Sequence, residues 1–167
     1  MVNLFNVNPE MESLIKMVFD SSLLRQMEEY KTWNRRDNNT ALACMAMAYP
    51  NLDIDFSPKN VPTFLVNYRP SLELIKEIED VLEYLKDIHL TSAMKRGMNF
   101  NLIFLLAKES KMKGMSANRF IDRVNSFFTD RKSFDYKKYE SFAPGWSKSF
   151  QMQSRLKILR EALLKKD

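Results

Sequence analysis

Glycine is scarce in this chain, because only Gly97, Gly114 and Gly145 occur among its 167 residues. A fold rich in strands needs many tight hairpin turns, and such turns draw heavily on glycine. Helices joined by short loops need far fewer glycines. The scarcity therefore favours an all-α chain of a length usual for one domain. We expect a single compact domain over residues 1–167, with about six to seven helices joined by short loops.

Capping residues and apolar spacing predict where these helices lie. Asn8-Pro9-Glu10 combines a capping side chain, a proline suited to the first helical position and an acid in the first turn. The clearest amphipathic pattern covers 70–89, with apolar residues three and four apart and acids on the other side. The predicted helical segments are 9–32 with a break or solvated turn at 20–22, 41–48, 63–67, 70–89, 92–113, 116–129 and 148–165. We expect 130–147 to be a looser stretch.

The sequence carries no signal for a membrane span or for export. Its longest apolar run, 41–49, is far shorter than the roughly 20 residues that a membrane helix needs. The N-terminus lacks the basic and apolar regions of a signal peptide. A lone cysteine, Cys44, excludes an intramolecular disulfide and agrees with a reducing compartment. We therefore expect a cytoplasmic protein without a membrane partner.

The two halves of the chain carry opposite charge. Residues 1–90 hold 9 Lys and Arg against 14 Asp and Glu, whereas 91–167 hold 17 against 7. The acidic half is thus −5 and the basic half +10, which accounts for the overall charge of +5. A basic half can bind a polyanion, because each cation that neutralises a phosphate releases condensed counterions.

Basic and aromatic residues are interleaved between 127 and 150. Exposed aromatic rings can stack on unpaired bases while lysines follow the phosphate backbone, so this composition is typical of a stacking platform for nucleic acid. The residues assigned to it are Arg131, Lys132, Tyr136, Lys137, Lys138, Tyr139, Trp146 and Lys148. In the alternative interpretation the aromatic residues belong to the core and the lysines only solvate its surface.

A second candidate anion site lies near the middle of the acidic half. Lys31, Arg35 and Arg36 precede Asp37-Asn38-Asn39, which can cap the start of a helix. Their side chains, together with free backbone amides at that helix start, could hold a phosphate. An ordinary capped helix with solvated arginines explains the same pattern.

No catalytic signature is present. There is no phosphate-binding Walker loop, dinucleotide fingerprint, nucleophile elbow or paired Cys/His zinc spacing. His89 lies at the end of a predicted helix, where a structural role is usual, and Asp53 with Asp55 fits a turn better than a metal site. We assign no catalytic residue, metal ligand or cofactor, which favours a protein that is not an enzyme and leaves an unrecognised enzyme as an open alternative.

Several short stretches resemble those of one known family. They are Asn34-Arg35-Arg36-Asp37-Asn38-Asn39-Thr40-Ala41-Leu42, Phe64-Leu65, the acidic segment 70–89, Asn99-Phe100-Asn101-Leu102 and Arg155-Leu156-Lys157-Ile158-Leu159. Over residues 30–165 the chain resembles the helical region that follows ParB-like nuclease domains in GmrSD-type restriction proteins. The catalytic half of that family, with its Asp-Gly-Gln-type motif, has no counterpart here. The resemblance therefore implies a helical module that binds nucleic acid or a partner, as in a small phage or mobile-element protein, and transfers no active-site residue.

Two functions from different classes remain open. The first is an accessory module that binds nucleic acid through the basic half. The second is an interaction or inhibitor protein whose polarised surface meets an oppositely charged partner, such as an acidic protein. The observation that distinguishes these two functions is whether the aromatic residues between 134 and 146 are exposed beside the lysines.

Overall fold

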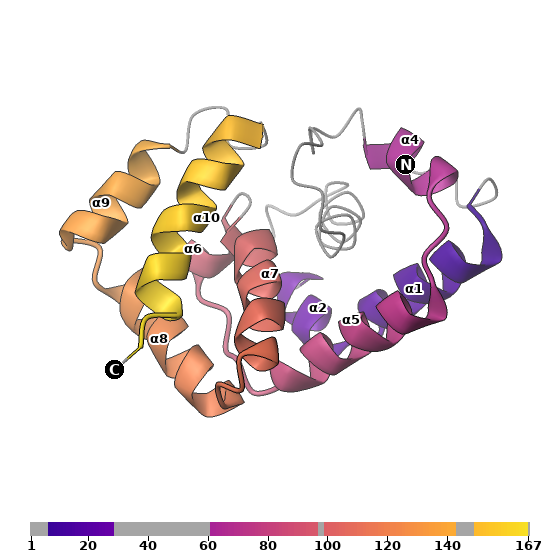
Figure 1. The fold of residues 1–167 in the computed structure, drawn as a ribbon, viewed down its shortest axis with the longest axis horizontal. Helices are drawn as coiled ribbons and strands as arrows, with labels where there is room; N and C mark the ends of the chain where they lie inside the picture. The colour runs from indigo at the N-terminus through magenta and orange to yellow at the C-terminus, as the bar shows by residue number, and fades with distance from the viewer. Residues whose placement is uncertain (1–6, 29–60, 97–98, 143–148, 167) are drawn as a thin grey trace.

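The computed structural model describes residues 7–28, 61–96, 99–142 and 149–166 (Figure 1). These residues form nine helices and no strand, which confirms the all-α expectation. In chain order, with the labels of Figure 1, the helices are α1 (Pro9–Phe19), α2 (Ser22–Glu28), α4 (Val61–Asn67), α5 (Leu72–Tyr84), α6 (Ser92–Lys95), α7 (Asn99–Met112), α8 (Ala117–Thr129), α9 (Phe134–Ser141) and α10 (Ser149–Leu163).

The helix count exceeds six to seven because of three local features. The segment predicted over 9–32, with a break or a solvated turn at 20–22, has the break, so α1 and α2 are separate. The segment predicted over 92–113 is likewise divided into α6 and α7. In addition, residues 134–141 form a helix where a looser stretch was expected, because Ser133 caps it and two tyrosines anchor it in the core.

Side-chain caps determine where several helices begin. The Asn8 side chain accepts a hydrogen bond from the Met11 amide at 2.8 Å, and Pro9 takes the first helical position of α1. Ser71 and Ser116 cap α5 and α8 through bonds from the amides three residues later. Each cap satisfies an amide that has no partner within its own helix. The start predicted at Asn8-Pro9 and the cap predicted at Ser116 are therefore confirmed.

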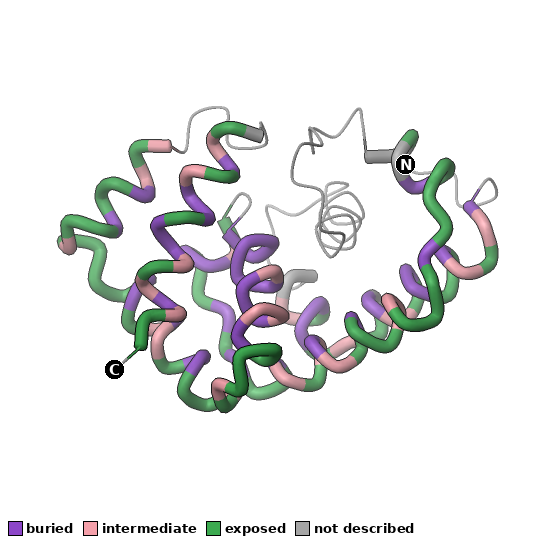
Figure 2. Tube along the Cα trace, viewed as in Figure 1, coloured by how far each residue is buried: buried purple, intermediate pink, exposed green. Residues whose placement is uncertain are grey.

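Helix α7 is the centre of the fold, and buried residues run along most of its length (Figure 2). It packs against α5, α6, α8 and α10. Since several neighbours cover it, α7 needs apolar residues around most of its circumference rather than along one stripe. Its buried residues include Phe100, Leu102, Ile103, Phe104 and Leu106.

The remaining helices extend from α7 towards opposite ends of the molecule (Figure 1). Helix α5 packs against both α7 and α1, whereas α10 packs against both α7 and α9. Helix α5 carries five acids and one lysine, whereas α10 carries Arg155, Lys157 and Arg160 against one acid, Glu161. The charge asymmetry along the sequence thus becomes a separation of charge in space.

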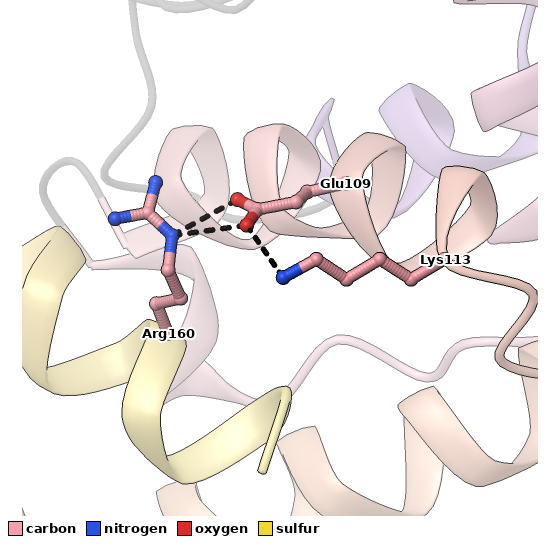
Figure 3. Close-up of polar contacts among 3 residues, drawn as sticks. All are labelled: Glu109, Lys113 and Arg160. Atoms are coloured by element: carbon pink, nitrogen blue, oxygen red, sulfur yellow. Dashed lines mark hydrogen bonds and ion pairs between the residues drawn. The ribbon is translucent and has the colours of Figure 1, made fainter. Parts of the chain in front are cut away.

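An ion-pair cluster joins α7 to α10 (Figure 3). Arg160 Nε on α10 lies 3.2 and 3.0 Å from the two carboxylate oxygens of Glu109 on α7, and Lys113 Nζ lies 3.2 Å from Glu109 Oε1. Burial would by itself raise the pKa of Glu109. The hydrogen bonds and charges of Arg160 and Lys113 outweigh burial and hold that pKa below its ordinary value.

Replacement of Glu109 by glutamine should lower the free energy of unfolding at pH 7 by about 0.5–1 kcal/mol, the range for partly exposed ion pairs. Because the pKa is lowered in the folded state, this stabilisation is complete above the ordinary carboxyl pKa and is lost as the pH falls through the lower folded value. The difference between wild type and Glu109→Gln should therefore stay constant from pH 7 to about 5 and shrink below about pH 4.

Urea denaturation at a series of pH values measures this difference. Glu161→Gln, on the exposed side of α10, is the matched control and should leave stability nearly unchanged. A difference for Glu109→Gln that persists undiminished at about pH 3 would contradict the assignment.

Candidate functional site

Helix α9 carries most of the described residues of the predicted nucleic-acid interface. It begins at Phe134 because the Ser133 side chain accepts a hydrogen bond from the Tyr136 amide at 3.1 Å. Asp135 adds a negative charge in the first turn, where the helix dipole favours it. The sequence therefore contains a helix start within a segment that was expected to be irregular.

The inner face of α9 is aromatic and buried. Tyr136 is 6% exposed and Tyr139 is fully buried. The Tyr139 ring makes edge-on contacts with Phe127 and Phe128 of α8, with centroids 5.4 and 6.0 Å apart. A ring enclosed in this way has no face for a nucleic-acid base. The stacking role predicted for Tyr136 and Tyr139 is therefore incompatible with their positions, and the alternative core interpretation holds for both residues.

A polar contact in the core holds Tyr139 in this orientation. Its hydroxyl donates a hydrogen bond to Asn99 Oδ1 at 2.5 Å, and Arg155 Nη2 donates to the same oxygen at 2.6 Å. The Arg155 guanidinium also lies over the Tyr139 ring, 4.3 Å from its centroid. Burial raises the pKa of Tyr139 far above its ordinary value and outweighs the opposing charge of Arg155, so this hydroxyl remains a donor.

The outer face of α9 is basic and carries one exposed aromatic ring. Phe134 is 78% exposed, and the turn residues Arg131 and Lys132 are exposed beside it along the chain. Lys137 and Lys138 follow Phe134 by three and four residues, so helical geometry places them on the same face. We call Arg131, Lys132, Phe134, Lys137 and Lys138 the outer α9 surface.

The acidic residues of this segment lie away from the centre of that surface. Asp135 follows Phe134 by one residue, which is about 100° around the helix. Glu140 is half-buried and lies on the side of Tyr136. The outer α9 surface therefore combines an apolar ring with four cations.

Phe134 was not among the residues assigned from sequence. The signal that identifies it is the helical period of residues 134–141, in which Tyr136 and Tyr139 share one face and Phe134 takes the opposite one. The remaining assigned residues, Trp146 and Lys148, lie outside the described residues. The same holds for the second candidate anion site at Lys31, Arg35 and Arg36.

The described residues contain no group of three or more histidine, cysteine, aspartate or glutamate side chains that could hold a metal ion. His89 is exposed beyond the end of α5. Cys44, Asp53 and Asp55 lie outside the described residues. Among the described helices, none is long and apolar enough to cross a membrane.

Comparison with protein-family models gave no match, and neither curated proteins nor solved structures gave a significant match to this chain.

The two faces of α9 should respond differently to substitution. Tyr139→Phe removes a buried hydroxyl that donates to Asn99 and should lower the free energy of unfolding by about 1–2 kcal/mol. Phe134→Ala removes an exposed ring and should change it by less than about 0.5 kcal/mol. Chemical denaturation of both variants measures these effects. An equal loss in Phe134→Ala would mean that its ring packs on the protein and is not free to bind a ligand.

Proposed function

We propose that this chain binds single-stranded nucleic acid through the outer α9 surface. The observation that carries the proposal is the exposure of Phe134 among Arg131, Lys132, Lys137 and Lys138. An exposed aromatic ring offers a flat apolar face on which a base can stack. Stacking on such a ring tolerates any base sequence, because every base has a π-face.

The four cations supply the second component of such binding. Lysine and arginine side chains neutralise backbone phosphates and so release counterions, which strengthens association at low salt. The rigid support of α9 also favours binding, because Tyr136 and Tyr139 anchor its inner face and keep the outer side chains together. The proposal agrees with the resemblance of residues 30–165 to the helical region that follows ParB-like nuclease domains in GmrSD-type restriction proteins.

An acidic protein is the second candidate partner for the same surface. The spatial separation of charge favours it, since α9 and the acidic α5 lie towards opposite ends of the molecule (Figure 1). The negative charge of α5 is partly neutralised by ion pairs within the protein. Lys76 pairs with Asp80 at 3.1 Å, and Lys108 pairs with Glu77 at 3.0 Å. The outer α9 surface is therefore the stronger candidate for contact with a partner.

The test measures binding of a fluorescein-labelled oligothymidine by anisotropy over a range of salt concentrations. Phe134→Ala should weaken binding by about 1–3 kcal/mol per lost base stack and leave the salt dependence nearly unchanged. The double change Lys137→Ala with Lys138→Ala should instead flatten the log–log salt slope by about 1.4, at about 0.7 per phosphate contact.

Two matched controls come from α5 and the turn that follows it. Leu72, which is 79% exposed, is the control for Phe134 because it is also an exposed apolar residue. Lys76 and Lys86 are the control for Lys137 and Lys138. Leu72→Ala and the double alanine variant of Lys76 and Lys86 should bind like wild type. Absence of wild-type binding at about 50 mM salt, where electrostatic association is strong, refutes the proposal and moves the acidic protein to first place. Equal losses in the controls also refute it.

A further inference from the structure

A second basic site lies where α7 ends, α8 begins and α10 ends. The three segments border a cavity of about 730 Å³ that is open to solvent. Four of its lining residues are cationic, namely Lys113, Arg119, Lys165 and Lys166, and no lining residue is acidic. None of these residues belongs to the outer α9 surface.

The first wall of the cavity is a tight turn between α7 and α8. The Gly114 amide donates to the Lys111 carbonyl and the Met115 amide to the Ser110 carbonyl, both at 3.1 Å, which is the bonding pattern of a Schellman motif. Gly114 has φ of +80°, a conformation that other residues adopt only with strain. The Tyr84 hydroxyl donates to the Met115 carbonyl at 2.8 Å and so ties this turn to α5. The wall is therefore held by several hydrogen bonds.

The second wall is the end of α10. Arg123 Nη1 on α8 donates to the carbonyl oxygens of Leu163 at 2.9 Å and Lys165 at 2.6 Å. These bonds fix the last residues of α10 against α8. Lys165 and Lys166 are thereby kept beside the cavity although both are exposed.

The charge around the cavity is only partly neutralised by the protein. Lys113 pairs with Glu109, which also receives Arg160 (Figure 3). Lys165 and Lys166 make no ion pair with any other residue that the structure describes. Like charges held together repel one another, so an anion in the cavity would relieve this repulsion.

We propose that this cavity binds a small anion that carries several connected phosphate groups. A volume of about 730 Å³ is typical of a small-molecule site and exceeds the needs of a single phosphate. Lysines bind phosphates as point charges, and Arg119 adds a planar donor in the first turn of α8. Met115 and Leu164 contribute an apolar part of the wall, against which an uncharged portion of the ligand can lie.

This site is independent of the proposed nucleic-acid surface. Helix α8 has 13 residues and is about 20 Å long. The cavity lies at the N-terminal end of α8, and the turn to α9 follows its C-terminal end. One site can therefore be tested while the other is intact.

The experiment is isothermal titration of the full chain with tripolyphosphate at about 50 mM salt, without divalent cations. The double change Lys165→Ala with Lys166→Ala should weaken binding about tenfold, because two charge contacts are lost. These substitutions remove exposed side chains and keep the backbone carbonyl that Arg123 holds, so the fold should survive. The double alanine variant of Lys137 and Lys138 is the matched control and should bind tripolyphosphate like wild type.

A parallel titration with adenosine triphosphate distinguishes the source of the phosphates. Competition between the two ligands, with similar or tighter binding of the nucleotide, supports a nucleotide in this cavity, and preference for tripolyphosphate supports an inorganic polyphosphate. Absence of tripolyphosphate binding by wild type overturns the proposal. An equal loss in the Lys137 and Lys138 variant also overturns it, because the effect would then come from net charge alone. Neither result depends on the oligothymidine measurements, so the two proposals can fail separately.

Discussion

A buried guanidinium organises the basic half of this protein. Arg155 of α10 is 3% exposed, donates to Asn99 at the start of α7 and lies over the Tyr139 ring of α9. Asn99 in turn donates to the Ala93 carbonyl of α6 at 2.8 Å. No carboxylate among the described residues pairs with Arg155, so an amide oxygen and an aromatic face offset the cost of burying its charge. Four helices meet at this one contact.

The orientation of α9 follows from that contact. Because Tyr139 must reach Asn99 and Arg155, the face of α9 that carries Phe134, Lys137 and Lys138 has to point outward. The edge-on contacts of Tyr139 with the α8 phenylalanines reinforce the same orientation. The short helix α9 thus holds Phe134, Lys137 and Lys138 together on its exposed face. The buried tyrosines and three of the five residues of the outer α9 surface lie on opposite faces of the same eight-residue helix.

Helix α7 connects this arrangement to the rest of the molecule. At its N-terminal end it takes part in the Arg155 contact, and at its C-terminal end Glu109 binds Arg160 of α10. The turn beyond α7 is tied to α5 through Tyr84, whose hydroxyl also lies 2.8 Å from Ser110 Oγ. The basic cavity therefore lies at a junction of three well-connected helices rather than on a loose loop. Two separate groups of cations thus lie near the two ends of α8.

The sequence by itself determined the features that depend on near neighbours along the chain. Glycine scarcity predicted the all-α class, and the caps at Asn8 and Ser116 predicted two helix starts, because a cap is a contact between residues three apart. The Ser133 cap of α9 is a local signal of the same kind, but only the tertiary structure decided that this helix has Tyr136 and Tyr139 inside and Phe134 outside. Aromatic rings lie on both faces of this helix, Phe134 on one and Tyr136 with Tyr139 on the other, so either face could have been buried. The choice came from Asn99 and Arg155, which are 40 and 16 residues from Tyr139 along the chain, and contacts at such separations exist only after the helices have packed.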